Sequence, residues 1–255
     1  MVRVIINSDD FGLNNEVNKA IAEAFEKGLI SSTTSLVNFT ASLNEASELV
    51  SQGRVPKESV GIHLNLSEGQ PLDPSSLKCE LLCSGDEFHG AIRNKPVFHL
   101  SKKDAKIIYL ELEAQLLKFI STYGFTPTHI DGHHHIHTEW AIMSIVIRLA
   151  KKYNIDKIRL TRNIGHGISI SKKIYKKILN TRLYLRGINT TDYFGDFHDL
   201  KSFTAPASGS LEIMVHAIPS TVTNQINDLD NKSLNEKIRT LQTGLNLELI
   251  NYTQL

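Results

Sequence analysis

The chain has 255 residues, 41% of them hydrophobic and 22% charged, and its formal net charge is +1. A chain of this length and composition can bury a large core, either as one α/β domain or as two smaller ones. The near-neutral charge argues against partners recognised by bulk electrostatics, so we expect neither nucleic acid nor a membrane surface as a partner.

The first residues, MVRVIINSDDFG, predict a short strand at 2–7 and argue against a secretion signal, because acidic residues follow the apolar run too soon. Cys79 and Cys83 are only four positions apart, where a disulfide would close a very small loop. Free thiols in a reducing compartment are therefore expected. Together these features predict a soluble, cytoplasmic protein.

Strand-like and helix-like stretches alternate along the rest of the chain. Residues 14–28 show a 3.6-residue apolar period that ends at Gly28, and Ser42 and Glu45 have the spacing of a capping box. Further strands are expected at 33–38, 59–66, 128–131, 157–162, 191–197 and 210–217, and further helices at 42–53, 101–124, 139–153, 172–186 and 233–245. Residues 67–100 contain many turn-forming glycines and prolines and predict a long irregular excursion.

Six or seven alternations of strand and helix, without a change in composition, predict one parallel-stranded domain over residues 1–255. A doubly wound open sheet and a (β/α) barrel share this order of elements. The stretch NSDDFGLNN after the first strand holds one glycine and two carboxylates, which is the wrong composition for a phosphate-binding loop. We therefore expect a distorted, TIM-barrel-like (β/α) barrel.

Polar, titratable residues fall at or just after the ends of several predicted strands, where the active site of a parallel barrel lies. They are Asp9, Asp10, His63, Asp131, His133, Arg159, Arg162 and His216. Alternate strand residues face opposite sides, so Arg159 and Arg162 are expected to have different roles. One should orient a catalytic carboxylate such as Asp9 or Asp131, and the other should lie in the loop or face a helix.

Each of these residues also has a purely structural interpretation. Asp9 and Asp10 could form only a helix N-cap and its dipole partner, although asparagines at 14 and 15 already suit the cap of the following helix. His63 and His216 lie in apolar runs and could be hydrogen-bonded core histidines. The sequence alone leaves both interpretations open.

The stretch THIDGHHHIHTEW, residues 128–140, contains five of the chain's eleven histidines. It is too central to be an affinity tag. We expect a loop in which one or two histidines are functional, while the others, among them His134, His135 and His137, are solvated or lie beside the ligands.

One carboxylate and two histidines at strand ends could hold a divalent ion and leave positions open for water and substrate. Such ligands suit Zn²⁺, Mn²⁺, Fe²⁺, Co²⁺ or Ni²⁺ and hold Mg²⁺ more weakly. No cysteine lies near these strand ends, so a closed structural zinc site is not expected. An open site would activate a water molecule for hydrolysis, with a spare carboxylate taking its proton and a histidine protonating the leaving group.

Five segments, in this order, resemble the YdjC-like carbohydrate deacetylases, whose best-described members are chitooligosaccharide deacetylases. They are INSDDFGLNNEVNKAI, STTSLVNF, VGIHLNLSEGQPL, PTHIDGHHHIH and LEIMVHAIPS, and they span most of the chain. The resemblance implies a distorted (β/α) barrel with one divalent ion, Mg²⁺ or Zn²⁺. It also implies removal of an acetyl group from an N-acetylated amino sugar or short oligosaccharide, by attack of a water molecule that the metal activates.

On the positions that match, the resemblance implies that Asp10, His63 and His133 are the metal ligands. It also implies that Asp9 is the general base and that His216 is the general acid or oxyanion partner. The remaining polar residues are expected to bind substrate or to support the ligands: Asp131, Arg159 and Arg162.

The chain departs from the family pattern at two positions near these residues. Ala217 stands where proline is more common after the last histidine, and Gly132 stands where serine is common. The excursion 67–100 matches the family only as far as EGQPL, so the sequence leaves the identity of the sugar open.

Two other classes of protein compete with this interpretation. A metal-dependent phosphoesterase or amidohydrolase on a barrel would use a second metal ion, for which the histidines at 134, 135 and 137 could supply ligands. A non-catalytic metal- or sugar-binding protein would need the ligands but neither Asp9 nor His216. A small acetylated sugar is the expected partner, and a homodimer is compatible with the sequence.

Overall fold

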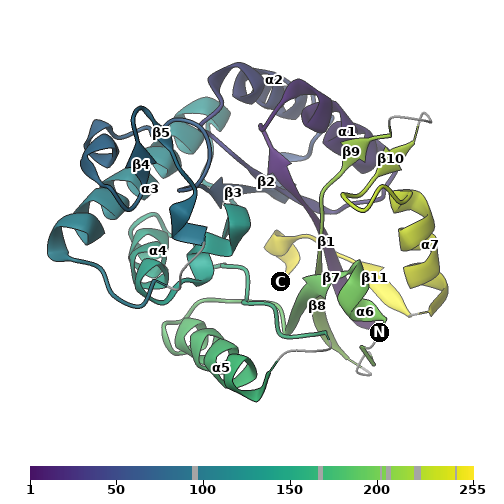
Figure 1. Cartoon of the computed structure of the whole chain (residues 1–255). Helices are drawn as coiled ribbons and strands as arrows, with labels where there is room; N and C mark the ends of the chain where they lie inside the picture. The colour runs from purple at the N-terminus through teal and green to yellow at the C-terminus, as the bar shows by residue number, and fades with distance from the viewer. Residues whose placement is uncertain (94–96, 166–168, 202, 205–207, 221–224, 245) are drawn as a thin grey trace.

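The computed structural model describes residues 1–93, 97–165, 169–201, 203–204, 208–220, 225–244 and 246–255. Its centre is a curved sheet whose strands run parallel, and helices surround this sheet (Figure 1). In spatial order the strands are β6 (Ile130–Gly132), β3 (Val60–Leu64), β2 (Ser32–Ser35), β1 (Val2–Phe11), β8 (Gly209–Val215) and β7 (Tyr193–Asp196). The predicted parallel sheet with helices around it is thereby confirmed.

β1 lies at the centre of the sheet and is longer than predicted. Its Ser8 pairs with Thr33 of β2 on one side and with Val215 of β8 on the other. Near its start, Val2 also pairs with Leu247 of β11 (Leu247–Leu249), a parallel strand that the sequence did not predict. β1 is buried along almost all of its length, as expected of a central strand in a parallel sheet.

The predicted strand at 157–162 is not a regular strand. Instead, the segment closes the gap between β6 and β7 with isolated bridges and single hydrogen bonds. Arg159 N donates to Ile130 O of β6 over 3.0 Å, and Asn163 N donates to Phe194 O of β7 over 3.2 Å. Residues 157–163 thus contact β6 near their start and β7 at their end, and within the described residues they form no continuous ladder with either strand.

Seven α-helices lie in the described residues. They are α1 (Asn15–Glu26), α2 (Thr40–Ser51), α3 (Lys102–Tyr123), α4 (Trp140–Lys152), α5 (Ile170–Leu185), α6 (Phe197–Leu200) and α7 (Leu234–Gly244). Short 3₁₀ turns are η1 (Lys57–Ser59), η2 (Pro74–Lys78), η3 (Ala91–Arg93), η4 (His133–Thr138) and η5 (Tyr252–Gln254). Among the helices of the described residues, we find none that is long and apolar enough to cross a membrane.

The predicted capping box at Ser42 is wrong, because α2 begins two residues earlier, at Thr40. Inside the helix, Ser42 Oγ donates to Gly12 O over 2.6 Å, and Ser42 O accepts from Asn18 of α1 over 2.7 Å. Asn18 Oδ1 in turn accepts from Gly12 N over 2.7 Å. These contacts fix the turn that directly follows β1, and so fix the end of the strand that carries Asp9 and Asp10.

Gly12 is required at this turn for two reasons. Its φ of +85° lies in the left-handed region that side chains disfavour. In addition, a Cβ at this position would come within 2.5 Å of Leu36 O. The glycine of the DDFG motif therefore allows β1 and the segment after β2 to approach closely.

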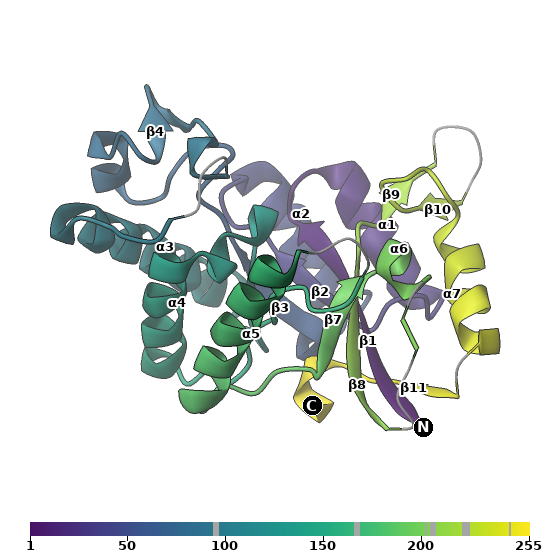
Figure 2. The ribbon, with the colours of Figure 1, turned by 60° about the horizontal axis from the view of Figure 1, so that its bottom comes forward.

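The excursion predicted at 67–100 contains η2, η3 and a small hairpin of β4 (Cys83–Ser84) and β5 (Glu87–Phe88). It lies above one end of α3 (Figure 2). Glu111 of α3, which is fully buried, accepts hydrogen bonds from Leu72 N, Asp73 N and Ser76 Oγ over 2.8–3.1 Å. The first part of the excursion is thus tied to α3.

Gln115, one turn later on α3, ties the segment that leads into this excursion. Its Oε1 accepts from Asn65 N over 2.9 Å, and its Nε2 donates to Asn65 O over 2.6 Å. The same amide also donates to Glu111 Oε1 over 2.8 Å. Because Asn65 follows His63 by two residues, α3 fixes the backbone directly after this predicted ligand.

The last part of the chain contains two further elements that were not predicted. A hairpin of β9 (Ile218–Pro219) and β10 (Ile226–Asn227) follows β8. After β11, Ile250 N donates to Val4 O over 2.9 Å, and η5 begins at Tyr252. In Figure 2, η5 (yellow) lies at the same end of the sheet as the start of β1.

Candidate functional site

Two adjacent carboxylates end β1, and an unusual backbone conformation lets both face the interior of the barrel. In a regular strand, Asp9 and Asp10 would point to opposite sides. Asp10 has a φ of +71°, and the register between β1 and β2 shifts between Ser8 and Phe11. As a result both side chains reach polar partners inside the barrel, and Asp9 is only 2% exposed.

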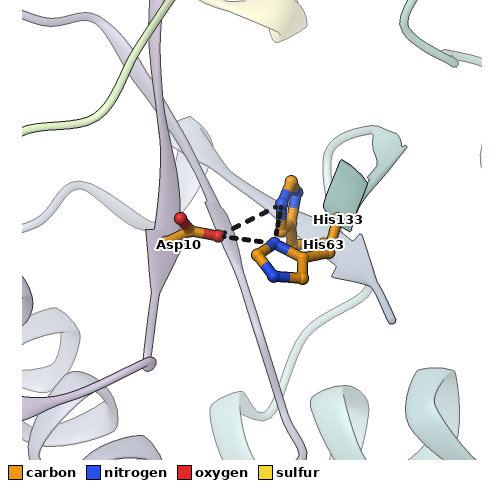
Figure 3. A group of neighbouring side chains, drawn as sticks. All are labelled: Asp10, His63 and His133. Carbon is orange, nitrogen blue, oxygen red and sulfur yellow. Dashed lines mark hydrogen bonds and ion pairs between the residues drawn. The ribbon is translucent and has the colours of Figure 1, made fainter. Parts of the chain in front are cut away.

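Asp10, His63 and His133 form one compact group. His133 Nδ1 lies 2.9 Å from Asp10 Oδ1, and His63 Nε2 lies 3.3 Å from the same oxygen. The two imidazole nitrogens are 3.3 Å apart. Figure 3 shows the carboxylate of β1 facing both rings, which come from β3 and from the start of η4. The structure therefore brings together the three residues expected as metal ligands.

A second carboxylate fixes the orientation of His63. Asp131 Oδ1 lies 2.6 Å from His63 Nδ1, and Asp131 Oδ2 accepts from Thr34 Oγ1 over 3.0 Å. When His63 is neutral, with its proton on Nδ1 facing Asp131, the lone pair of Nε2 would be available to a metal ion. A carboxylate behind a histidine ligand is the usual support in metal sites, because it fixes both tautomer and ring orientation.

Arg159 joins the carboxylates behind the group. Its Nη1 and Nη2 donate to the two oxygens of Asp9 over 2.8 and 2.7 Å, and Nη1 also lies 2.6 Å from Asp131 Oδ2. Nε donates to Glu212 Oε1 of β8 over 2.7 Å. All four side chains are buried. One guanidinium is therefore surrounded by three carboxylates, and Asp9 is held in the bidentate geometry typical of strong arginine–carboxylate pairs.

These contacts determine the protonation of Asp9 and Asp10. Burial alone would raise the pKa of Asp9, but Arg159 outweighs burial and holds the pKa well below its usual value. For Asp10, burial again acts to raise the pKa, and hydrogen bonds from His133 and His63 lower it well below the usual value. Both carboxylates are therefore ionised at neutral pH.

His216 lies just after β8, on another side of Asp10. Its Nε2 is 3.9 Å from Asp10 Oδ2, and its side chain is 21% exposed. The backbone around it is fixed, since His216 N donates to Asp228 Oδ1 and Ala217 N donates to Ser8 Oγ, each over 3.0 Å. Proline at position 217 could not make the second of these bonds, because it has no N–H.

Arg162 is not brought to Asp9 or to the predicted ligands. Its Nε lies 2.5 Å from Asp199 Oδ2 and its Nη2 contacts Asp196, both at the start of α6. The side chain is 34% exposed. Arg162 thus organises the end of β7 and the beginning of α6.

The histidine cluster folds back inside the barrel and is less solvated than expected. His134 and His135 both have left-handed backbone angles, with φ of 52° and 58°. The turn that they make places His137 in the interior, at 0% exposure, and Gly132 leaves room for its ring. Burial lowers the pKa of His135 to about 3 and lowers the pKa of His137 strongly, so both rings are neutral. The extra histidines were expected to be solvated or to lie beside the ligands, and for His137 the first of these alternatives is wrong.

Sequence reasoning missed three residues of this network: Thr34, Glu212 and Tyr252. Tyr252 OH donates to Glu212 Oε2 over 2.5 Å, and thereby extends the network from Asp9 to η5. Glu212 carried a signal, because it is a charged residue inside the apolar strand LEIMV. Thr34 sits in a run of small polar residues, and nothing near Tyr252 in the sequence indicates its place.

Comparisons with known proteins agree with the family resemblance found in the sequence. The model of the family described as YdjC-like protein matches residues 3–246. This chain belongs to the YdjC-like family. A relative from Halalkalibacterium halodurans, named carbohydrate deacetylase, is 33% identical over 218 residues, which cover 84% of each chain. A relative of the same name from Clostridium beijerinckii is 30% identical and covers 98% of this chain and 94% of its own length.

The fold of a solved structure agrees with the barrel described above. A crystal structure from Enterococcus faecalis V583, whose name refers to cellobiose-phosphate cleavage, superposes with a TM-score of 0.71. The comparison covers 99% of this chain and 98% of the other, at 23% identity. At that identity the likeness concerns the fold, and the expected distorted barrel is confirmed.

Proposed function

We propose that this YdjC-like protein is a carbohydrate deacetylase that hydrolyses the acetamide group of an N-acetylated amino sugar or a short oligosaccharide of such sugars. Two relatives that cover most of the chain are named carbohydrate deacetylases. The observation that carries the proposal is the convergence of Asp10, His63 and His133, with the ionised Asp9 directly beside them.

The donor set fits one divalent ion. Ligand atoms at about 2.0–2.2 Å from a metal ion stand roughly 2.8–3.6 Å apart in tetrahedral or octahedral arrangements. The three atoms here, Asp10 Oδ1, His63 Nε2 and His133 Nδ1, are separated by 2.9–3.3 Å. Mg²⁺ and Zn²⁺ are the ions that we propose.

When bound, the ion would polarise the acetyl carbonyl and lower the pKa of a water molecule. Asp9 is then placed to accept the proton of the attacking water. Asp9 Oδ1 accepts from Arg159 Nη2 and from Asn7 Nδ2, whereas Oδ2 accepts only from Arg159 Nη1 among the described residues. Because a carboxylate oxygen accepts more than one hydrogen bond, Oδ2 is the oxygen that we propose takes the proton. The low pKa of Asp9 ensures that it is ionised before the reaction.

His216 is placed to protonate the departing amine. It reaches Asp10 from the end of β8 while Asp9 reaches Arg159 from the end of β1, so the two groups come from different strands. Amide hydrolysis requires a proton to be removed from water and a proton to be given to nitrogen, at different sides of the tetrahedral carbon. Two separate residues would meet this requirement.

We also propose that the enzyme acts in the cytoplasm. That it forms a homodimer stays a prediction.

A second candidate, a two-metal phosphoesterase or amidohydrolase, draws on one observation. Glu68, His133 and His134 also offer ligand atoms close to one another, and this second group shares His133 with the first. Glu68 is 43% exposed, at the rim of the group. The stoichiometry of bound metal separates the two candidates, since a deacetylase of the proposed kind binds one ion per chain.

The decisive experiment measures acetate release from N-acetylated mono- and disaccharides in the presence of Mg²⁺, Zn²⁺, Mn²⁺ or Co²⁺, with phosphate release from sugar phosphates measured in parallel. We expect acetate from at least one N-acetylated sugar, and only with metal. Phosphate release with two bound ions, and no acetate from any sugar, would refute the proposal.

A further inference from the structure

A chain of four buried side chains runs from Tyr252 of η5 to Asp9, the proposed base. Tyr252 OH donates to Glu212, Glu212 accepts from Arg159 Nε, and Arg159 donates to Asp9. Tyr252, Glu212 and Arg159 are each 0% exposed. A polar chain of this kind in a protein interior is costly unless all its members are paired, so each member constrains the next.

Glu212 fixes the edge of the Arg159 guanidinium that the other hydrogen-bond partners of Arg159 do not contact. Asp9 and Asp131 both bind the Nη end of the guanidinium. The ring of Phe194 lies below its plane, 4.9 Å from Cζ. Only Glu212 holds the Nε edge among the described residues. Without that contact the guanidinium could pivot around its Nη end. Its two hydrogen bonds to Asp9, which Asn7 Nδ2 also holds over 2.9 Å, would then lose their geometry.

Tyr252 holds Glu212 from the end of the barrel where β1 begins. Its ring stacks on His129, with centroids 3.6 Å apart and planes at 10°. His129 itself packs against Gly61, where a Cβ would come within 2.4 Å of the imidazole. The tyrosine ring is therefore fixed by packing, and its hydroxyl is fixed with it.

We propose that Glu212 and Tyr252 are positioning residues, which hold Arg159 in the orientation that presents Asp9 to the reacting water. The inference rests on the proposed function in one respect, that Asp9 takes a proton during the reaction. The path from Tyr252 to Arg159 is a structural relationship and can be tested separately.

The charge on Glu212 adds a pH-dependent consequence. Burial raises the pKa of the Glu212 carboxyl to about 7, against the opposing effects of Arg159 and Tyr252, while Asp131 raises it further. Arg159, Tyr252 and Asp131 are the charged and titratable groups that act on it from the neighbouring elements. Without the tyrosine hydroxyl, the carboxylate loses a donor and the pKa of Glu212 should rise. Glu212 would then lose its charge at a higher pH.

The test compares Tyr252→Phe with Tyr123→Phe as a matched control. Tyr123 OH also makes a hydrogen bond, to Ser35 Oγ over 2.7 Å, which is partly buried and does not involve Arg159. Phenylalanine keeps the ring at both positions, so both variants should fold. Glu212→Gln serves as the third variant and removes the charge while keeping the shape.

We expect Tyr252→Phe to lower kcat about tenfold, with KM and Mg²⁺ affinity unchanged, and to move the acidic limb of the kcat profile to higher pH. Glu212→Gln should lower kcat roughly 10- to 100-fold, again with metal affinity unchanged. Tyr123→Phe should leave both kcat and the profile as in the wild type. If Tyr252→Phe behaves like Tyr123→Phe, the inference is overturned.

A second measurement is independent of activity. The slowly exchanging Nε–H resonance expected of the buried Arg159 should be visible in the wild type and in Tyr123→Phe, and should broaden or vanish in Tyr252→Phe and Glu212→Gln. If the wild type releases no acetate from any sugar, the proposed function fails, and this resonance still decides the inference. Its loss in Tyr252→Phe supports the positioning path, and its persistence overturns it.

Discussion

Asp9 and Asp10 are neighbours in the chain, yet each is bound by a different set of side chains. Asp9 Oδ1 lies 2.7 Å from Arg159 Nη2, and Asp10 Oδ1 lies 2.9 Å from His133 Nδ1. The left-handed backbone at Asp10 separates the two environments within one residue. Two carboxylates with the same chemistry can therefore have different functions, one towards a metal ion and one towards a proton.

Replacement of His133 tests the proposed metal ligands. His133→Ala removes one of three converging atoms and should weaken binding of Zn²⁺ or Co²⁺ by more than about 100-fold, with loss of activity. Isothermal titration of the metal-free protein measures this affinity. His89→Ala, at an exposed histidine of the excursion, is the control and should bind as the wild type does. Full metal occupancy in His133→Ala would remove His133 from the ligand set.

Metal binding should release a proton at neutral pH. In the metal-free protein, burial acts to lower the pKa of His63, but Asp131, Asp10 and Asp9 outweigh it and raise the pKa to about 10. The ring is therefore protonated at pH 7 and must lose its proton to bind a metal ion. Affinity should fall about tenfold for each unit that the pH decreases below 10. Titrations in buffers of different ionisation enthalpy should give close to one proton released per ion; a value near zero would contradict the protonated state of His63.

The raised pKa of His63 also predicts how the stability of the metal-free protein depends on pH. A histidine whose pKa is higher in the folded state than the unfolded value of about 6.5 stabilises the fold when protonated. This contribution is complete below about pH 6.5 and is lost as the pH rises towards 10. Thermal unfolding between pH 6 and 10 should therefore show a falling Tm. The slope should be smaller in His63→Gln, which cannot titrate.

Asp9→Asn tests the proposed base without removing a proposed ligand. We expect kcat to fall by about 10²–10⁴-fold while the metal stays bound, because the amide cannot accept the proton of water. The variant should be assayed for acetate release and for metal content by mass spectrometry. Asp156→Asn, at an exposed carboxylate paired with Lys157, is the matched control. An unchanged kcat in Asp9→Asn would assign the base to another residue.

His216→Ala should affect the opposite side of the pH profile. A group that donates a proton must carry it before the reaction, so the loss of His216 should remove the basic limb of the kcat/KM profile. The rate should fall by about 10²–10⁴-fold, with metal binding retained. If the basic limb persists in this variant, His216 has a different role.

Replacement of the two arginines should lower the stability of the protein by different amounts. Arg159→Ala leaves three buried carboxylates without their counter-charge, and removal of one partner of a buried pair typically costs about 3–5 kcal/mol. Arg162→Ala removes partly exposed pairs with Asp196 and Asp199, which should cost about 1 kcal/mol or less. Urea unfolding of the metal-free proteins measures both. Equal losses in the two variants would contradict the buried network.

The alternation of strands and helices, and the residues at the strand ends, could be predicted from the sequence because both follow from local patterns. Asp10, His63 and His133 each lie near or just after the end of a predicted strand, and parallel strands bring such positions to one edge. The spacing of Arg159 and Arg162 also indicated that only one would face the interior.

Other features could not be predicted, because they depend on contacts between distant segments. The bond between Tyr252 and Glu212 spans 40 residues, and no pattern near Tyr252 marks it. Ser42 has the local pattern of a cap, but its contacts with Gly12 and Asn18 keep it inside a helix that starts earlier. The segment at 157–162 has the composition of a strand, yet its position between β6 and β7 allows only isolated bridges.

The clamp that Glu111 and Gln115 make on the backbone from Asn65 to Asp73 has a consequence for ligand selectivity. Segments that become ordered only when a ligand arrives lose conformational entropy at that moment, and this loss weakens binding. Here the segment that follows His63 is already held by α3 in the folded chain. A sugar that contacts this segment should bind without such an entropic loss, and one that does not fit should be rejected, because the segment has little freedom to adapt.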